Sequence, residues 1–74
     1  MSESVTARLT SDRAIRILRH HGFQRAGDSG PHEKWRHPLT GRQVIVTYHR
    51  RVLPLRTISA IIEGSGIEAS DWPR

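Results

Sequence analysis

The sequence predicts one small α+β domain in which a helix, a three-stranded antiparallel meander and a second helix follow one another. Helical spacing of apolar residues near both ends, and strand-favouring runs between turn signals in the middle, indicate this order. The chain has 74 residues, of which 35% are hydrophobic, so it has material for a single core. Because each predicted helix has one apolar face, we expect both helices to cover the same face of the sheet and leave the other open.

The first predicted helix covers residues 11–21. Its apolar side chains fall on one stripe, which comprises Ala14, Ile15 and Leu18. Thr10 or Ser11 can cap the first turn with a side-chain oxygen. Gly22 suits the left-handed position after a helix, and Phe23 then stands where a Schellman ending places an apolar contact.

Three strands are predicted over residues 23–26, 32–37 and 42–49. Residues 27–31 form a dense turn signal between the first two strands, and residues 38–41 form a second turn. The third run is rich in β-branched side chains, which favour strands.

The second predicted helix begins at Pro54 and ends at Gly64 and Gly66. Its apolar stripe comprises Leu55, Ile58, Ile61 and Ile62. Residues 67–72 are expected to form a short final turn or helix.

The alternation of side chains in the second strand separates its two faces. His32, Lys34 and Arg36 share one face, and Trp35 lies on the other. Since Trp35 is the large apolar residue of this strand, we expect its face to meet the core. The histidine and the two cations are then predicted to point away from the core.

The third strand is read in the same way. Val44 and Val46 are assigned to the core, which places His49 on the open face with His32. This assignment also places Ile45 on the open face, which is its weak point, and a β-bulge would reverse the parity.

Positive charge dominates the composition. Twelve Lys and Arg oppose seven Asp and Glu, giving a net charge of +5, and eleven of the twelve cations are Arg. A small domain this basic is expected to meet a polyanion, and the guanidinium fork suits phosphate. On this basis, Arg42, Arg50 and Arg51 are expected to lie near the open face and add phosphate contacts.

Several classes of protein are excluded or disfavoured. Cysteine is absent, which excludes disulfides, cysteine-based zinc sites and thiol nucleophiles. No apolar run approaches the roughly 20 residues that span a bilayer, and the start lacks the features of a signal peptide, so we expect a cytoplasmic protein without a membrane partner. Residues 1–10 are expected to form a flexible leader, and residues 11–74 the single domain.

Short stretches of the chain, in a fixed order and spacing, resemble the HicA family of bacterial toxins. These stretches are residues 17–23, 30–38, 41–46, His49 and residues 53–62. The resemblance implies a double-stranded-RNA-binding-domain-like α-β-β-β-α fold. It also implies ribonuclease activity on mRNA without a metal or cofactor, and neutralisation by a HicB-type antitoxin. We expect that partner to be acidic and to cover the face of His32.

The resemblance also assigns a catalytic histidine. In the family it follows a glycine and a small hydroxyl residue at the start of the second strand, and His32 occupies that position. Here Pro31 replaces the hydroxyl residue. Thr47 stands where the family tends to have proline, so pairing of the third strand is expected to run further.

Histidine suits general-base chemistry because its ordinary pKa, about 6.5, lies near cellular pH. His32 is predicted to deprotonate a ribose 2′-hydroxyl, while Lys34 and Arg36 offset the charge that develops on phosphate. His49 is a candidate for a second acid–base group or a phosphate contact. No pair of histidines has the compact spacing of a zinc motif. Two other classes stay open: a non-catalytic RNA-binding module on this fold, and a basic partner for an acidic protein.

Overall fold

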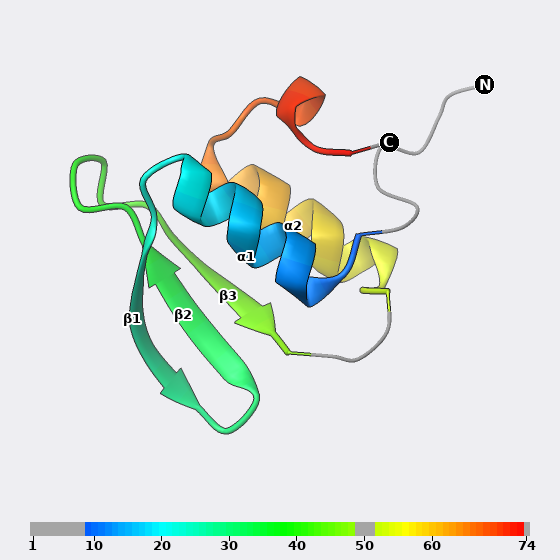
Figure 1. The fold of residues 1–74 in the computed structure, drawn as a ribbon, viewed down its shortest axis with the longest axis horizontal. Helices are drawn as coiled ribbons and strands as arrows, with labels where there is room; N and C mark the ends of the chain where they lie inside the picture. The colour runs from blue at the N-terminus through cyan, green and yellow to red at the C-terminus, as the bar shows by residue number, and fades with distance from the viewer. Residues whose placement is uncertain (1–8, 49–51, 74) are drawn as a thin grey trace.

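A computed structural model describes residues 9–48 and 52–73. It confirms the predicted order of helix, three strands and helix (Figure 1). The elements are α1 (Ser11–His20), β1 (Gln24–Ser29), β2 (His32–Arg36), β3 (Gln43–Thr47), α2 (Leu55–Ser65) and a short 3₁₀ helix, η1 (Ala69–Asp71). No helix in the described ranges has the length and apolarity needed to cross a membrane.

Both ends of α1 follow the predicted chemistry. Thr10 is the N-cap, and its hydroxyl oxygen accepts a hydrogen bond from the Arg13 N–H at 3.2 Å. At the other end, Gly22 has a φ of 94° and the Phe23 N–H donates to the Leu18 carbonyl at 2.9 Å. This is the Schellman arrangement, and it turns the chain directly into β1.

The three strands form one antiparallel sheet in the order β1-β2-β3, so β2 is central. The predicted turn over residues 27–31 is wrong in its extent, because β1 continues to Ser29. A β-bulge between Arg25 and Gly27 absorbs one residue and lets the strand continue. The hairpin then closes over Gly30 and Pro31 alone, and the φ of 63° at Gly30 is a conformation that glycine adopts at no steric cost.

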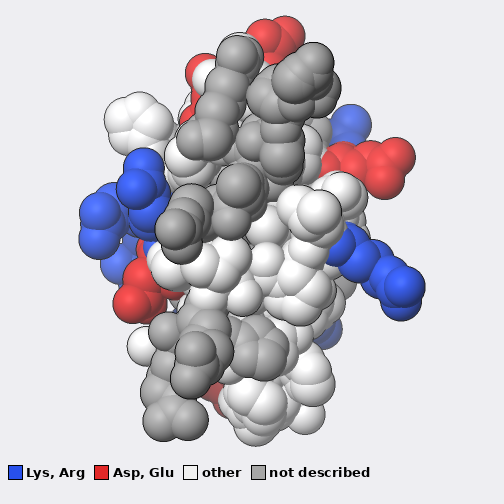
Figure 2. All heavy atoms as spheres, turned by 90° about the vertical axis from the view of Figure 1, so that its right-hand side faces the viewer, with Lys and Arg blue, Asp and Glu red and all other residues white. Residues whose placement is uncertain are grey.

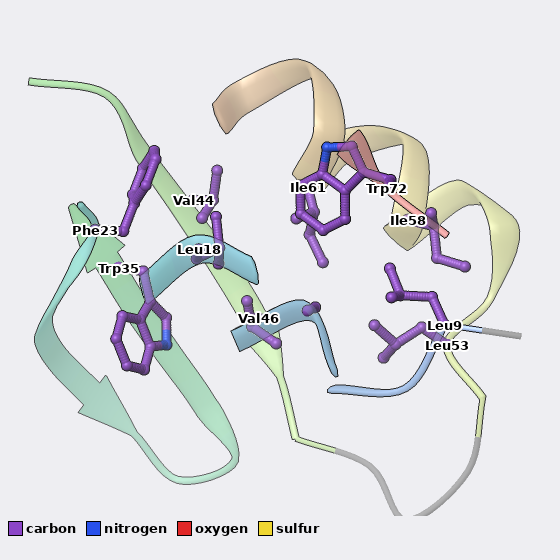
Figure 3. Close-up of a cluster of buried hydrophobic side chains, with 11 residues drawn as sticks. Leu9, Leu18, Phe23, Trp35, Val44, Val46, Leu53, Ile58, Ile61 and Trp72 are labelled. Carbon is purple, nitrogen blue, oxygen red and sulfur yellow. The ribbon is translucent and has the colours of Figure 1, made fainter. Parts of the chain in front are cut away.

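The core lies between one face of the sheet and the two helices (Figure 3). Both helices pack chiefly against β3. The buried apolar residues are Leu9, Ala14, Leu18, Phe23, Trp35, Val44, Val46, Leu53, Ile58, Ile61 and Trp72. None of them comes from β1, so the β1–β2 hairpin extends beyond the helices in Figure 1. Leu9, which lies in the predicted leader, packs in this core, and Thr10 is the helix cap, as one of the two predicted candidates.

Candidate functional site

The strand β2 separates a core face from an open face, as its alternation predicts. Trp35 is 2% exposed and packs in the core. Its neighbours Lys34 and Arg36, and also His32, are exposed. The predicted orientation of the histidine and the two cations is therefore confirmed.

The strand register places the neighbours of these three residues on a regular grid. His32 lies between Ser29 of β1 and Thr47 of β3. Lys34 lies between Gly27 and Ile45 in the next row. The open face thus consists of Gln24, Gly27, Ser29, His32, Lys34, Arg36, Gln43, Ile45 and Thr47. None of these residues is acidic, so the face carries only cationic and neutral side chains.

A hollow of about 190 Å³ lies on the half of the open face near the hairpin turn. It is lined by Gly27, Asp28, Ser29, His32, Lys34 and Ile45, and we call it the hairpin hollow. His32 therefore lines a concave surface large enough for part of a small ligand, which an isolated surface histidine would not do.

Backbone contacts fix His32 at the mouth of the tight hairpin. The carbonyl of Pro31, the residue before it, accepts a hydrogen bond from the Tyr48 N–H at 2.7 Å. His32 itself pairs with Thr47, so β3 is paired up to its end, as the threonine at this position predicts. Pro31 thus has no side-chain hydroxyl to offer, but its carbonyl anchors the turn to β3.

The two cations of β2 lie at different distances from His32. Residues two apart along a strand are about 7 Å apart, and residues four apart about 13 Å. Lys34 therefore belongs to the hairpin hollow with His32, whereas Arg36 lies in the far row, between Gln24 and Gln43. A single phosphate beside His32 is within reach of Lys34, and Arg36 is placed for a neighbouring one.

The two carboxylates of the hairpin both lie close to Arg25. Arg25 lies 2.9 Å from Asp28 and 3.8 Å from Glu33, measured between nitrogen and oxygen atoms. The Trp35 indole N–H also donates to a Glu33 carboxylate oxygen at 3.2 Å. Although Asp28 lines the hairpin hollow, its carboxylate is paired with Arg25, which offsets part of its repulsion of an anion there.

The prediction that Arg42 lies near the open face is wrong. Since Gln43 faces outward opposite Arg36, the preceding residue faces the helices. Its side chain packs over Gly66 at the end of α2, so closely that a Cβ on that glycine would lie 2.6 Å from Arg42 Nε. Arg42 lines a separate cavity of about 330 Å³ between the ends of the two helices.

His37 has a structural role, as expected for a residue beside a turn. Its Nδ1 accepts hydrogen bonds from the N–H groups of Leu39 and Thr40, at 3.2 and 3.3 Å. Its ring meets Phe23 edge to face, with 5.2 Å between centroids. Among the described residues, no group of three His, Asp or Glu side chains is arranged to hold a metal ion.

The predicted residues His49, Arg50 and Arg51 lie outside the described residues. Conversely, Gly27 and Ser29 line the hairpin hollow, although both lie in a predicted turn. Only a predicted bulge would have revealed them, because strict alternation from Phe23 onward gives the wrong parity beyond Arg25.

Positive charge is spread around the molecule rather than gathered at one spot. Figure 2 shows Lys and Arg side chains projecting at two opposite margins of the view, with Asp and Glu side chains beside them. Among the exposed cations, Arg13 and Arg16 lie on α1 and Arg56 on α2. The net charge therefore favours encounter with a polyanion in general, while the open face supplies the local arrangement.

Comparison with protein families gives a match over residues 11–67 to the family described as the HicA toxin of bacterial toxin–antitoxin systems. A search of curated proteins gave no match. The matched segment contains α1, the whole sheet and α2, and so includes the hairpin hollow and every described residue of the open face. The chain belongs to the HicA family of bacterial toxins, and it is the toxin of a toxin–antitoxin system with a cognate antitoxin as partner.

Proposed function

We propose that this toxin is an endoribonuclease that cleaves mRNA, with His32 as the general base. The observation that carries the proposal is the exposed side chain of His32, which shares the hairpin hollow with Lys34, while Asp28, the acidic residue of the hollow, is paired with Arg25. Membership of the HicA family supports the same reading. Loss of translatable mRNA in the bacterial cytoplasm then accounts for toxicity.

The proposed reaction uses the nucleophile that RNA itself carries. His32 takes the proton of a ribose 2′-hydroxyl, and the resulting oxygen attacks the adjacent phosphorus. The bond from phosphorus to the 2′-oxygen forms while the bond to the 5′-oxygen of the next nucleotide breaks. The leaving oxygen takes a proton from water, and the protonated His32 returns its proton to the hydroxide that remains. The products are a 2′,3′-cyclic phosphate and a 5′-hydroxyl, and no metal is required.

Lys34 is the proposed electrostatic partner of this step. Lys34 lines the same hollow as His32. Its ammonium group is proposed to offset the negative charge that grows on the phosphate oxygens in the transition state. Arg36, one row further along β2, is proposed to hold a neighbouring phosphate. His49, Arg50 and Arg51 stay predicted RNA contacts, whereas Arg42 is directed away from this face.

The cognate antitoxin is proposed to be of the HicB type and to act by covering the open face. An acidic surface is complementary to Lys34 and Arg36, and a protein seated there excludes RNA from His32. A structure of the complex in which His32 stays open to solvent would contradict this part of the proposal.

The test compares the wild type with His32→Ala on a single-stranded RNA in EDTA. We expect the wild type to cut the RNA to 2′,3′-cyclic phosphate and 5′-hydroxyl ends, and the variant to lose about 10²- to 10⁴-fold in rate. His20→Ala is the matched control, because His20 is also an exposed histidine but lies at the end of α1.

Cleavage that survives His32→Ala would refute the assignment of His32 as the general base. RNA binding without cleavage by the wild type would indicate a non-catalytic RNA-binding module, and a salt-insensitive protein complex without RNA binding would indicate a protein-interaction partner.

A further inference from the structure

The residues that line the hairpin hollow besides His32 and Lys34 indicate which part of the RNA lies beside the reacting ribose. Resting on the proposed function, we infer that the hollow binds an unpaired nucleobase, that of the nucleotide whose 2′-hydroxyl reacts, with Ile45 as its apolar floor. Ile45 is thereby a substrate-binding residue of the toxin.

Ile45 is the aliphatic side chain of the open face, and it is 46% exposed. A single exposed isoleucine is ordinary on a protein surface and by itself indicates nothing. Here, however, it lines a concave site together with His32 and Lys34. When a flat, weakly hydrated surface such as the face of a base covers an apolar group in a hollow, apolar surface leaves water and the free energy of binding becomes more favourable.

The row that contains Ile45 is shaped to accept a flat group. Ile45, Lys34 and Gly27 lie side by side across the three strands. The aliphatic stem of Lys34 continues the apolar surface while its ammonium group stays in water. At Gly27 there is no side chain, and a Cβ placed there would meet nothing within 4 Å. The space above this end of the row is therefore open.

The position of this row relative to His32 identifies the nucleotide. His32 lies in the adjacent row of the grid, about 7 Å along the strand. Within one nucleotide the base and the 2′-hydroxyl are attached to neighbouring ribose carbons. A base resting on Ile45 thus brings its own 2′-hydroxyl towards His32. The nucleotide in the hollow is then the one on the 5′ side of the broken bond.

A base can lie flat against the sheet only after it has left its partner and its stacked neighbours. Unpairing and unstacking a base in a duplex costs a few kcal/mol, whereas in a flexible single strand the cost is small. The inference therefore selects single-stranded RNA, although folds of this type are best known from proteins that bind duplexes by shape and phosphate contacts.

The first arm of the test measures binding alone, in a protein that cannot cut. In the His32→Ala background we compare Ile45→Ala with Leu39→Ala, using fluorescence anisotropy on a short single-stranded RNA. Leu39 is a matched control because it is an exposed aliphatic residue, 89% exposed, in the β2–β3 turn and away from the hollow. We expect Ile45→Ala to weaken binding about tenfold and Leu39→Ala to leave it unchanged.

The second arm alters the RNA. A strand that lacks the base on the 5′ side of the mapped cleavage site removes the group that Ile45 contacts. We expect this abasic RNA to bind the His32→Ala protein and the His32→Ala, Ile45→Ala double variant equally.

We also expect the wild type to cut the single strand about a hundredfold faster than the same sequence in a duplex. Ile45→Thr is a further control, because it keeps a β-branched residue in β3. If Ile45→Thr and Ile45→Ala weaken RNA binding equally, a weakened strand is excluded as the cause.

The outcomes separate this inference from the function on which it rests. If the wild type cuts RNA in a His32-dependent manner but Ile45→Ala behaves like Leu39→Ala, the base site is refuted and the proposed function stands. Equal cutting of single and double strands refutes the base site in the same way. If the wild type cuts no RNA, the proposed function fails first.

Discussion

The guanidinium group of Arg19 lies over the indole of Trp35, with its central carbon 5.3 Å from the ring centroid. The ring is thus enclosed by α1 on one side, while its N–H donates to Glu33 on the hairpin. Because Trp35 stands between Lys34 and Arg36 in β2, its burial forces both cations onto the open face. The core residue therefore sets the orientation of the functional strand.

Trp35→Ala is expected to lower the free energy of unfolding by about 3–5 kcal/mol, since it removes one of the two tryptophan side chains of the core. The total free energy of unfolding of a small domain is about 5–15 kcal/mol, so a measurable fraction of this variant will be unfolded. Urea unfolding followed by circular dichroism measures the loss. Leu39→Ala, which removes an exposed aliphatic side chain, serves as the control and should change the unfolding midpoint little. A Trp35→Ala protein as stable as this control would contradict the described core.

Gly22 and His37 form a second test of packing, in a place where only glycine fits. Gly22 has a φ of 94°, and a Cβ there would lie 2.8 Å from His37 Nε2. Gly22→Ala is expected to cost about 1–3 kcal/mol of stability because it combines backbone strain with this clash. Adding His37→Ala removes the clash but keeps the strain. In a double-mutant cycle the two changes should therefore cost less together than the sum of each alone. Strict additivity would place the two residues out of contact.

The grid on the open face predicts different effects for its two cations. For binding to single-stranded RNA, the logarithm of the binding constant falls with the logarithm of the salt concentration. Lys34→Gln and Arg36→Gln should each make this slope shallower by about 0.7, as expected for one lost phosphate contact. Only Lys34→Gln should also lower the cleavage rate at saturating RNA, because only Lys34 shares the hollow with His32. Arg56→Gln on α2 is the charge-matched control. Equal rate losses for the two β2 variants would contradict the row assignment.

Ser29 faces His32 directly across the hairpin and lines the same hollow. Directly opposed residues have Cβ atoms about 4.5–5.5 Å apart, so the hydroxyl is near the imidazole and near any ribose that it contacts. Ser29→Ala is expected to lower the cleavage rate about two- to tenfold, the value of one hydrogen bond, without changing stability. Single-turnover kinetics measures the cleavage rate, and urea unfolding measures the stability. Ser70→Ala in η1 is the control.

Much of this arrangement follows from the sequence because it rests on local periodicity. The alternation around Trp35 fixes the outward direction of His32 and Lys34, and the same rule exposes Ile45. The Schellman ending at Gly22 follows from residue types within one turn of helix. These features need no knowledge of contacts between distant parts of the chain.

The features that the sequence analysis missed depend on such contacts or on a break in periodicity. The bulge in β1 reverses the parity after Arg25, and the glycine, aspartate and serine that follow are typical of a turn. Arg42 was placed by its charge, yet the end of α2 and the glycine there accommodate its guanidinium group. Residue type gave no indication of which helix end would lie beside it.

The bulge in β1 has a further effect on the outer edge of the sheet. An edge strand exposes a regular row of N–H and C=O groups on which another polypeptide can align. In β1 the extra residue, Ala26, interrupts that regularity in the middle of the strand and increases its local twist. A straight strand from a neighbouring molecule can match the groups on only one side of the interruption. The irregularity that places Gly27 on the open face thus also disfavours self-association through the β1 edge of the sheet.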